Sequence, residues 1–285
     1  MSTRSRSRPV RRRRLVIVRT YNATEAGIER MWQWKHSLTG DYDFCVSIDI
    51  SHERGLKQRL LQRFGDDGVG VHEYTEADML DEYPCLVPLE GNMPDDWRDW
   101  VGPHGSFAPW GFHTEAINLC FRSMERMGDY EHVWVFEDDV GVSGGSLLDF
   151  LQQYDGVDEY ETVDLLSCSA HSALPEWCWF NQGTDSYLSA VKGDERFVSP
   201  EHVQRFSSRL LDKLHECSKA SCTAWSEQSS PSLCLHHKLR FEPFASHTIG
   251  EIYNFDGLVS EEEFEQFNRD NVESGTCKIY HALKY

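Results

Sequence analysis

An apolar strand that runs directly into three acids constrains this chain more than any other feature. The residues from Tyr130 to Phe136 are mostly β-branched or aromatic, which predicts a buried strand, and Glu137, Asp138 and Asp139 follow without a break. Adjacent carboxylates repel one another and lose hydration near a sheet, so stability alone does not explain them. A divalent cation with oxygen ligands removes that conflict. The sequence therefore predicts a cation site at the end of a buried strand.

The same triplet can also be interpreted as a solvated strand end ahead of a glycine turn at Gly144-Gly145. The apolar strand before the acids disfavours that interpretation. Side chains alternate along a strand, so Asp138 is expected to face away from Glu137 and Asp139. Only one or two of the three acids would then contact a metal directly.

Strand and helix patterns alternate through the first half of the chain. Leu15 to Val18 predicts an opening strand, a helix follows through Trp34, and a second strand over 44–50 carries Asp49 near its end. Two strands joined by a helix within about 35 residues are typical of a parallel sheet. Such sheets bind ligands just beyond the carboxyl ends of their strands, which is where the triplet lies.

Further elements follow from apolar spacing. We expect a helix over 53–65, irregular structure over 66–112, a helix over 113–127 with apolar residues at i, i+3, i+4 and i+7, and a strand over 163–169. Ser199-Pro200 predicts the start of a helix whose buried face carries Val203, Phe206, Leu210 and Leu214. The predicted fold class is α/β, a mostly parallel Rossmann-type sheet flanked by helices, with a more irregular C-terminal part.

The charge of the chain is divided between a basic leader and an acidic body. Seven of the 28 basic residues are Arg within the first 14 positions, so residues 15–285 carry 21 basic and 47 acidic side chains. We predict a disordered leader over 1–14 and one domain over 15–285, with a nucleotide-binding half over 15–150 and an acceptor half over 151–285. A body this acidic repels phosphate backbones, so no nucleic-acid partner is expected.

The nine cysteines are scattered, several lie in apolar runs, and no CxxC pair is present. This pattern favours buried thiols and argues against a structural zinc site. No apolar run is long enough for a transmembrane segment, and the basic N-terminus has no apolar stretch of the secretory kind.

The segment from Val133 to Val140 (Val-Trp-Val-Phe-Glu-Asp-Asp-Val), with the Gly/Ser turn and Leu147-Leu-Asp-Phe-Leu151 after it, resembles the DxD-type motif of nucleotide-sugar glycosyltransferases of the GT-A fold. The Glu-Asp-Asp variant is similar to that of the Golgi N-acetylglucosaminyltransferase family that begins complex N-glycans. The resemblance covers about 20 residues as a motif and extends over 15–180 as an order of elements. It implies a GT-A-like fold and transfer of a hexosyl or N-acetylhexosaminyl group from a nucleotide-diphosphate donor to a hydroxyl acceptor such as a glycan.

The resemblance also implies roles for individual residues. Asp139 would bind a Mn²⁺ or Mg²⁺ ion that bridges the donor diphosphate, and Asp138 would reach the ribose. Glu137 would lie near the nucleotide, and Arg19 and Asp49 would flank its base. A metal held by carboxylate stabilises the charge that develops on a diphosphate leaving group.

Two further candidates lie downstream. Glu227, in a polar turn beside Trp225, is the candidate catalytic base, with Asp185 and Glu176 as alternatives and an exposed loop acid as the competing interpretation. His247 resembles the late histidine that completes the metal shell in many enzymes of this fold, and a core histidine is the alternative.

Tryptophans near the predicted site have two interpretations. Trp177 and Trp179 follow a strand and could contact the sugar, although core packing of one of them is an equal alternative. Trp97, Trp100 and Trp110 could belong to a lid over the donor.

Three other functions compete with a transferase. A nucleotidyltransferase would carry a glycine-rich loop after the first strand, whereas no glycine follows Arg19 until Gly27. A phosphoreceiver domain would need an Asp at the end of a later strand, and the strand over 163–169 has none there. A non-catalytic sugar- or nucleotide-binding protein on a decayed transferase fold remains an alternative, and metal-dependent donor hydrolysis would separate it from an enzyme. For location, enzymes with this resemblance usually work in the Golgi lumen behind an anchor, so we expect either the cytosol or an anchor outside this chain.

Overall fold

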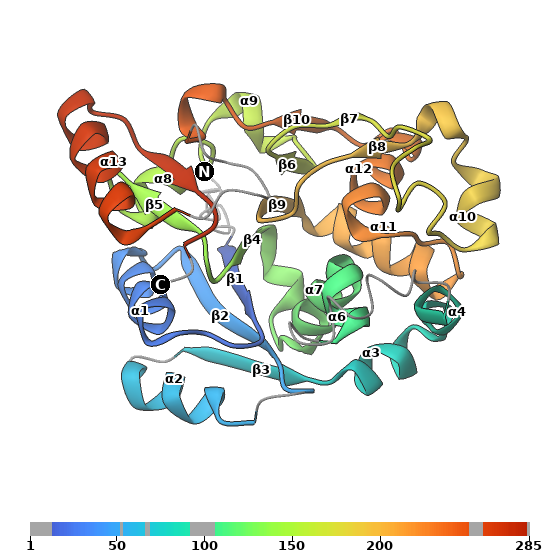
Figure 1. Cartoon of the computed structure of the whole chain (residues 1–285), viewed down its shortest axis with the longest axis horizontal. Helices are drawn as coiled ribbons and strands as arrows, with labels where there is room; N and C mark the ends of the chain where they lie inside the picture. Colours follow the sequence, from blue (N-terminus) through green and yellow to red (C-terminus); the bar gives the residue numbers. More distant parts are fainter. Residues whose placement is uncertain (1–12, 52–53, 66–68, 92–105, 251–258, 284–285) are drawn as a thin grey trace, which may run out of the picture.

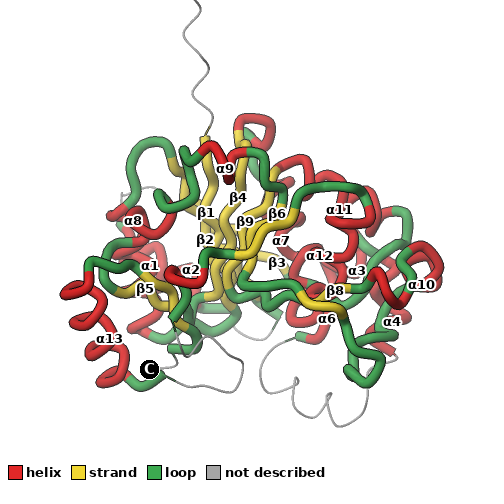
Figure 2. Tube along the Cα trace, turned by 90° about the horizontal axis from the view of Figure 1, so that it is seen from above, coloured by secondary structure: helices red, strands yellow, loops and turns green. Residues whose placement is uncertain are grey.

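A computed structural model describes residues 13–51, 54–65, 69–91, 106–250 and 259–283. Its centre is a seven-stranded sheet in the order β10-β6-β9-β4-β1-β2-β3, which crosses the molecule between two groups of helices (Figures 1 and 2). The strands are β1 (Arg13–Thr20), β2 (Tyr42–Asp49), β3 (Gly70–Tyr74), β4 (Tyr130–Glu137), β6 (Leu165–Ser167), β9 (Val203–Ser207) and β10 (Phe241–Pro243). The predicted α/β class, with a mostly parallel sheet flanked by helices, is confirmed.

The direction of the strands determines where a ligand can bind. β1 pairs in parallel with both β2 and β4, and β3 pairs with β2. The strands β2 and β3 therefore lie on one side of β1, and β4 lies on its other side. Within the seven-stranded sheet, only β9 runs antiparallel to its neighbours, β4 and β6. The carboxyl ends of β1 and β4 therefore form the topological switch point, which is the usual ligand crevice of such sheets.

Helices cover both faces of the sheet. The side chains of β1 alternate between them, with Val16 and Val18 in one core and Leu15 and Ile17 in the other. One face is covered by α1 (Glu25–Ser37), α2 (Leu56–Phe64) and α8 (Leu147–Leu151), and the other by α7 (His113–Ser123), α10 (Asp185–Ala190), α11 (Ser208–Lys219) and α12 (Ser226–His236). Both halves of the chain supply strands to the one sheet.

Smaller elements surround this framework. Two short antiparallel pairs join β5 (Gly141–Ser143) to β11 (Lys278–Tyr280) and β7 (His171–Ser172) to β8 (Phe197–Val198). The remaining α-helices are α3 (Glu76–Glu82), α4 (Val87–Gly91), α6 (Phe107–Gly111), α9 (Asp158–Glu161) and α13 (Glu261–Ser274). Short 3-10 turns occur at Pro84–Leu86, Met127–Asp129, Gly193–Glu195 and Ser246–Thr248. No helix among the described residues is both long and apolar enough to cross a bilayer.

The structure corrects two predictions from the sequence. The stretch 66–112 is not irregular throughout, because β3, α3, α4 and α6 lie within it and form a third apolar cluster. No helix begins at Ser199-Pro200: Val203 and Phe206 lie in strand β9, and the helix begins at Ser208 with Ser207 as its N-cap. The spacing of Leu210 and Leu214 is helical, but the two apolar residues before it belong to an antiparallel strand.

The first strand begins at Arg13, two residues before the predicted boundary, so Arg13 and Arg14 belong to the sheet. Arg13 Nε donates to Asp43 Oδ2 at 2.8 Å, and Arg14 Nη2 donates to Glu161 Oε1 at 3.2 Å. The rest of the predicted leader lies outside the described residues. All nine cysteines are free, and five of them are buried, as their apolar context indicates.

A buried charge network ties β9 to the sheet. Arg205 Nη1 donates to Asp155 Oδ1 at 2.9 Å, with side-chain exposures of 0% and 1%. Tyr42 Oη and Trp134 Nε1 donate to the other oxygen of Asp155 at 2.9 and 2.8 Å, and Arg14 Nε lies 3.4 Å from it. The carboxylate is therefore the counter-charge of the fully buried Arg205, and it shares Arg14 with Glu161.

We predict that Asp155→Ala lowers the free energy of unfolding by about 3–5 kcal/mol, because Arg205 loses its buried counter-charge. Urea denaturation followed by circular dichroism measures this. The matched control is Glu159→Ala, an exposed acid on the neighbouring helix α9, which should change stability by less than about 0.5 kcal/mol. Equal effects of the two substitutions would contradict a structural role for the network.

Candidate active site

The acids predicted from the sequence lie at the switch point between β1 and β4. Arg19 and Glu137 are register partners at the ends of these strands, and Arg19 Nη2 donates to Glu137 Oε1 at 2.9 Å. The half-buried carboxylate at the end of β4 is thus paired with a cation from the adjacent strand.

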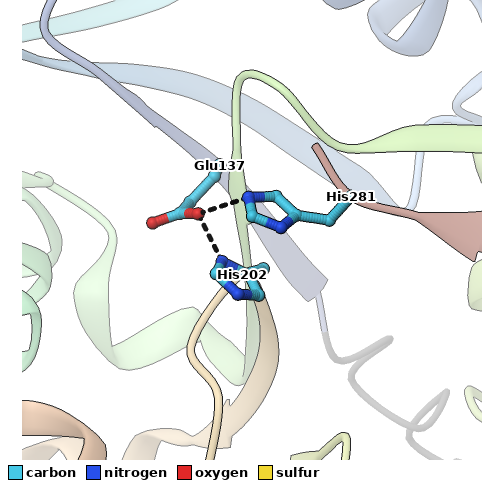
Figure 3. Close-up of side chains that lie close together, drawn as sticks. All are labelled: Glu137, His202 and His281. Atoms are coloured by element: carbon cyan, nitrogen blue, oxygen red, sulfur yellow. Dashed lines mark hydrogen bonds and ion pairs between the residues drawn. The ribbon is translucent and has the colours of Figure 1, made fainter. Parts of the chain in front are cut away.

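Two histidines from distant parts of the chain complete the surroundings of Glu137. His202 Nδ1 lies 2.7 Å and His281 Nε2 lies 3.4 Å from Glu137 Oε2 (Figure 3). The two imidazole rings stack with their centroids 3.5 Å apart. His281 Nε2 also lies 3.3 Å from Asp139 Oδ1, so one histidine contacts two acids of the triplet.

The strand alternation separates Asp138 from the other two acids, as predicted. Its Oδ2 accepts a hydrogen bond from Thr20 Oγ1 at 2.9 Å, and Arg30 Nη2 donates to its backbone oxygen at 2.9 Å. Burial and the charge of Asp139 raise the pKa of Asp138 to about 7. The triplet therefore presents Glu137 and Asp139 toward the histidines and Asp138, whose pKa is raised, toward β1.

The C-terminal segment brings His281 to the acids. β11 pairs with β5, the short strand just after the triplet, and Leu283 N donates to Asp139 O at 2.7 Å. Gly141 permits this approach, since a Cβ there would lie 2.2 Å from Leu283 Cδ1. Backbone hydrogen bonds on either side of His281 in the sequence, through β11 and through Leu283, therefore hold it beside the end of β4.

A second group of carboxyls, Glu201 and Glu227, lies within electrostatic range of Glu137 and has raised pKa values. Glu201 is 4% exposed, and its Oε2 lies 2.7 Å from His113 Nδ1. Burial raises the pKa of Glu201 well above its usual value, reinforced by the charge of Glu227, and burial lowers the pKa of His113 well below its own. Burial therefore disfavours the charged form of both members of this pair.

Glu227 lies in the first turn of α12 and is half-buried. Burial and the charge of Glu137 raise its pKa to about 7, against the lowering effect of a hydrogen bond from Trp225, whose Nε1 lies 3.3 Å from Glu227 Oε2. The charge of Glu137 acts on Glu227, and that of Glu227 acts on Glu201, so the three carboxyls lie within electrostatic range of one another. A carboxyl with a pKa near 7 can take up and release a proton at neutral pH.

An aromatic stack supports Glu227. Trp179 lies parallel to Trp225 with ring centroids 3.8 Å apart and an interplanar angle of 2°, and Trp110 packs edge-on against both. Trp179 is 4% exposed, whereas Trp177 is half-buried. Trp179 therefore takes the core alternative that the sequence left open, and only Trp177 remains available to a ligand. Trp97 and Trp100, assigned to a lid with Trp110, lie outside the described residues.

The other two sequence candidates do not join the cluster in Figure 3. Asp49 ends β2, is buried and accepts hydrogen bonds from the backbone and hydroxyl of Ser51 at 2.9 and 2.5 Å. His247 is exposed in the 3-10 turn Ser246–Thr248 and is absent from the groups of potential metal ligands among the described residues. The histidine beside Asp139 is His281.

Sequence reasoning missed His113, Glu201, His202 and His281. His281 was partly indicated by the sequence, because a late histidine was expected to complete the metal shell, and both His247 and His281 occur near the end of the chain. His202 and Glu201 follow Pro200 in a segment that was interpreted as a helix, and no spacing links either residue to the triplet. Only the pairing of β9 with β4 brings them there.

The residues around Glu137 fit a divalent cation. One ligand atom each from Glu137, His202 and His281 lies within 4.8 Å of the others, and carboxylate with imidazole is a donor set suited to Mn²⁺ or Zn²⁺. Burial alone would lower the pKa of His281, but the hydrogen bonds and charges of Asp139 and Glu137 raise it to about 9. Without a metal, His281 is therefore protonated at neutral pH, and its imidazolium supplies the positive charge beside these acids.

Comparisons with known proteins give structural likeness only. No protein-family model matches the chain, and no curated protein sequence matches it. Mouse xyloside xylosyltransferase 1 is similar over 96% of this chain and 98% of its own, at 10% identity and a TM-score of 0.43. A mannosyltransferase from Pyrobaculum calidifontis, in complex with GDP-Man and Mn²⁺, is similar over 82% of this chain at 13% identity and a TM-score of 0.43. This chain spans 55% of that protein.

A cytidylyltransferase from Leptospira borgpetersenii is similar over 82% of this chain and 75% of its own, at 10% identity and a TM-score of 0.38. All three TM-scores are below 0.5. The reaction must therefore be inferred from the site itself.

We predict that Trp179→Ala lowers the free energy of unfolding by about 3–5 kcal/mol, because a buried indole stacked on Trp225 is replaced by a cavity. Urea denaturation provides the measurement. The half-buried Trp177→Ala is the matched control and should cost less than half as much. A larger loss for Trp177 would show that the stack is not the element that supports Glu227.

Proposed function

We propose that this protein is a metal-dependent glycosyltransferase that moves a sugar from a nucleotide-diphosphate donor to a hydroxyl acceptor. The observation that carries the proposal is the arrangement of Glu137, Asp139, His202 and His281 at the switch point of a mostly parallel sheet. Acids and imidazoles gathered where such sheets bind ligands suit a cation that is shared with an anionic substrate. The resemblance of Val133 to Val140 to a DxD-type motif supports the same reaction.

The donor side of the proposed site is built from β1, β2 and β4. Asp139 and His281, with Glu137 and His202, would hold Mn²⁺; the imidazoles favour Mn²⁺ over Mg²⁺, which prefers oxygen ligands. The ion would supply positive charge to the diphosphate leaving group. His281 takes the role that the sequence assigned to His247.

The nucleotide contacts are proposed from the positions of the remaining residues. Asp138 is turned toward β1 and is available to a ribose hydroxyl, and Asp49 lies two strands from β4 at the same edge of the sheet. Arg19 is paired with Glu137, so we propose that it orients this carboxylate as well as flanking the base.

Glu227 is proposed as the base that accepts the proton of the acceptor hydroxyl. Its half-buried carboxyl has a pKa of about 7, so a large fraction is ionised at neutral pH while the group stays basic enough to bind a proton. Trp225 fixes one oxygen by its indole N–H. Burial and the charge of Glu227 raise the pKa of Glu201 well above its usual value, which disfavours charge on both acids at once. Trp177 is the proposed sugar contact.

A thermal-shift panel of nucleotide sugars, with and without Mn²⁺, tests the function most directly. Donor binding to the folded state raises the melting temperature by mass action. We expect one nucleotide sugar to raise it only when Mn²⁺ is present, and release of free nucleotide to follow. Binding without release would favour the non-catalytic alternative, and pyrophosphate release from a nucleoside triphosphate would favour a nucleotidyltransferase.

We predict that Asp139→Ala reduces metal-dependent turnover by about 10²-fold or more, because the diphosphate loses a cation ligand. Donor turnover is measured over a range of Mn²⁺ concentrations, and circular dichroism verifies the fold. The exposed acids Asp185 and Glu176 supply controls, since their alanine variants should retain full turnover. Undiminished turnover in Asp139→Ala would remove the proposal.

We predict that Glu227→Gln lowers kcat by about 10²–10⁴-fold while the Kd for the donor is unchanged. A base with a raised pKa is ionised only above that value, so the wild-type kcat should fall as the pH decreases below about 7. The variant should lose this dependence. Kinetics between pH 5.5 and 8.5, with donor titrations at each pH, provide the data. An equal loss of donor affinity would assign Glu227 to donor binding instead.

A further inference from the structure

A cavity of about 680 Å³ opens at the edge of the sheet opposite the proposed active site. It is lined by the first residues of β1 and β4, the last residue of β9 and the segment after α9. Glu131, His132 and Glu161 lie in its wall, and one ligand atom of each lies within 4.8 Å of the other two. Glu131 lies six positions before Glu137 in β4, roughly 20 Å away along the strand.

A β-bulge explains how two consecutive residues of β4 reach the same cavity. The register between β1 and β4 shifts between Arg13 and Arg14: Arg13 pairs with Tyr130 and Arg14 with His132. Glu131 is the extra residue of the bulge. In a regular strand Glu131 and His132 would face opposite sides, whereas a bulge redirects one of the two side chains.

His132 shows that the position is suited to a ligand. Its side chain is 1% exposed, and its Nδ1 has no hydrogen-bond partner among the described residues. A buried polar nitrogen without a partner costs free energy, and such atoms are rare unless a water or an ion completes them. The Nδ1 atom of His132 is therefore available as a metal ligand, because it makes no hydrogen bond to the described residues.

Glu161 is held in place by its neighbours. Its Oε1 accepts hydrogen bonds from Arg14 Nη2 at 3.2 Å and from Gly156 N at 2.7 Å. Both contacts use the same oxygen, so the carboxylate is oriented while Oε2 takes no part in them. Glu131 and Glu161 are half-buried, and rotation of their side chains can bring their oxygens to the spacing of about 3.3 Å found between ligands of a tetrahedral zinc ion.

The charges around the cluster permit a cation. Arg205 pairs with Asp155, Arg14 is shared between Asp155 and Glu161, and Arg13 pairs with Asp43. Arg209 at the rim pairs with Asp164, Nη2 to Oδ2, at 2.6 Å. Asp129 also lines the cavity. The two glutamates therefore are not outweighed by cationic neighbours.

We propose that Glu131, His132 and Glu161 bind a divalent transition-metal cation of the Zn²⁺ type at this second site. An imidazole with two carboxylates suits such an ion better than Mg²⁺ or Ca²⁺, which take oxygen ligands. The cavity provides room for water in the remaining coordination position. An ion here would join the start of β4 to α9, and the site is independent of the proposed transferase function.

Isothermal titration of the chelator-treated full chain with Zn²⁺ tests the proposal. We expect two bound ions in the wild type and one in Glu131→Gln and in Glu161→Gln. His281→Gln should also bind one ion, at the second site, and Glu131→Gln/His281→Gln should bind none. The two glutamates are half-exposed, so their amide variants should fold, and circular dichroism with melting curves verifies this. The exposed Glu159→Gln on α9 is the matched control and should bind two ions.

The outcomes are distinguishable from those of the active site. A single ion in the wild type that is lost in Glu131→Gln supports the second site and contradicts metal binding at the triplet. A single ion lost only in His281→Gln overturns the second site, as does unchanged stoichiometry and affinity in both Glu131→Gln and Glu161→Gln. Absence of Zn²⁺ binding in the wild type overturns it as well.

Discussion

The site of this protein is organised around one carboxylate, Glu137, whose negative charge is compensated by several partners. A carboxylate at the end of a buried strand loses hydration and must recover that free energy from counter-charges and hydrogen bonds. Arg19 from β1, His202 from the segment before β9 and His281 from the C-terminus supply them. Burial would raise the pKa of Glu137, but these partners hold it well below its usual range. Segments that are far apart in the chain therefore converge on one charge.

Around this charge lie two groups of carboxyls, one in contact with histidine and one with raised pKa values. Glu137 and Asp139 contact His281, while Glu201 and Glu227 have raised pKa values because burial disfavours their charge. Environments that shift the pKa values of similar groups apart give them different chemical roles. The acids and histidines of the first group suit cation binding, and a carboxyl with a pKa near 7 suits proton transfer. Both groups suit the reaction that we propose.

Where sequence and structure disagree, the cause is tertiary context. Val203 and Phe206 have a spacing that a helix could use, but both lie in β9, where antiparallel pairing with β4 determines their conformation. Short apolar runs do not distinguish strand from helix by periodicity alone. The stretch 66–112 has weak apolar periodicity, and its short elements are held by packing, as the tilted and edge-on contacts of Phe107 and Phe112 with Trp225 illustrate. About half of the candidate site, the acids and Glu227, could be predicted from local pattern.

By itself, the sequence determined the α/β class, the strand that ends in Glu137, Asp138 and Asp139, and the opposite orientation of Asp138. These are local properties, because they follow from apolar runs and from the two-residue repeat of a strand. Only the tertiary structure decided that His281 rather than His247 contacts the acids, that Glu201 pairs with His113, and that a bulge places Glu131 beside His132. Such contacts join residues tens to hundreds of positions apart or depend on the register of a neighbouring strand, and no local pattern encodes them.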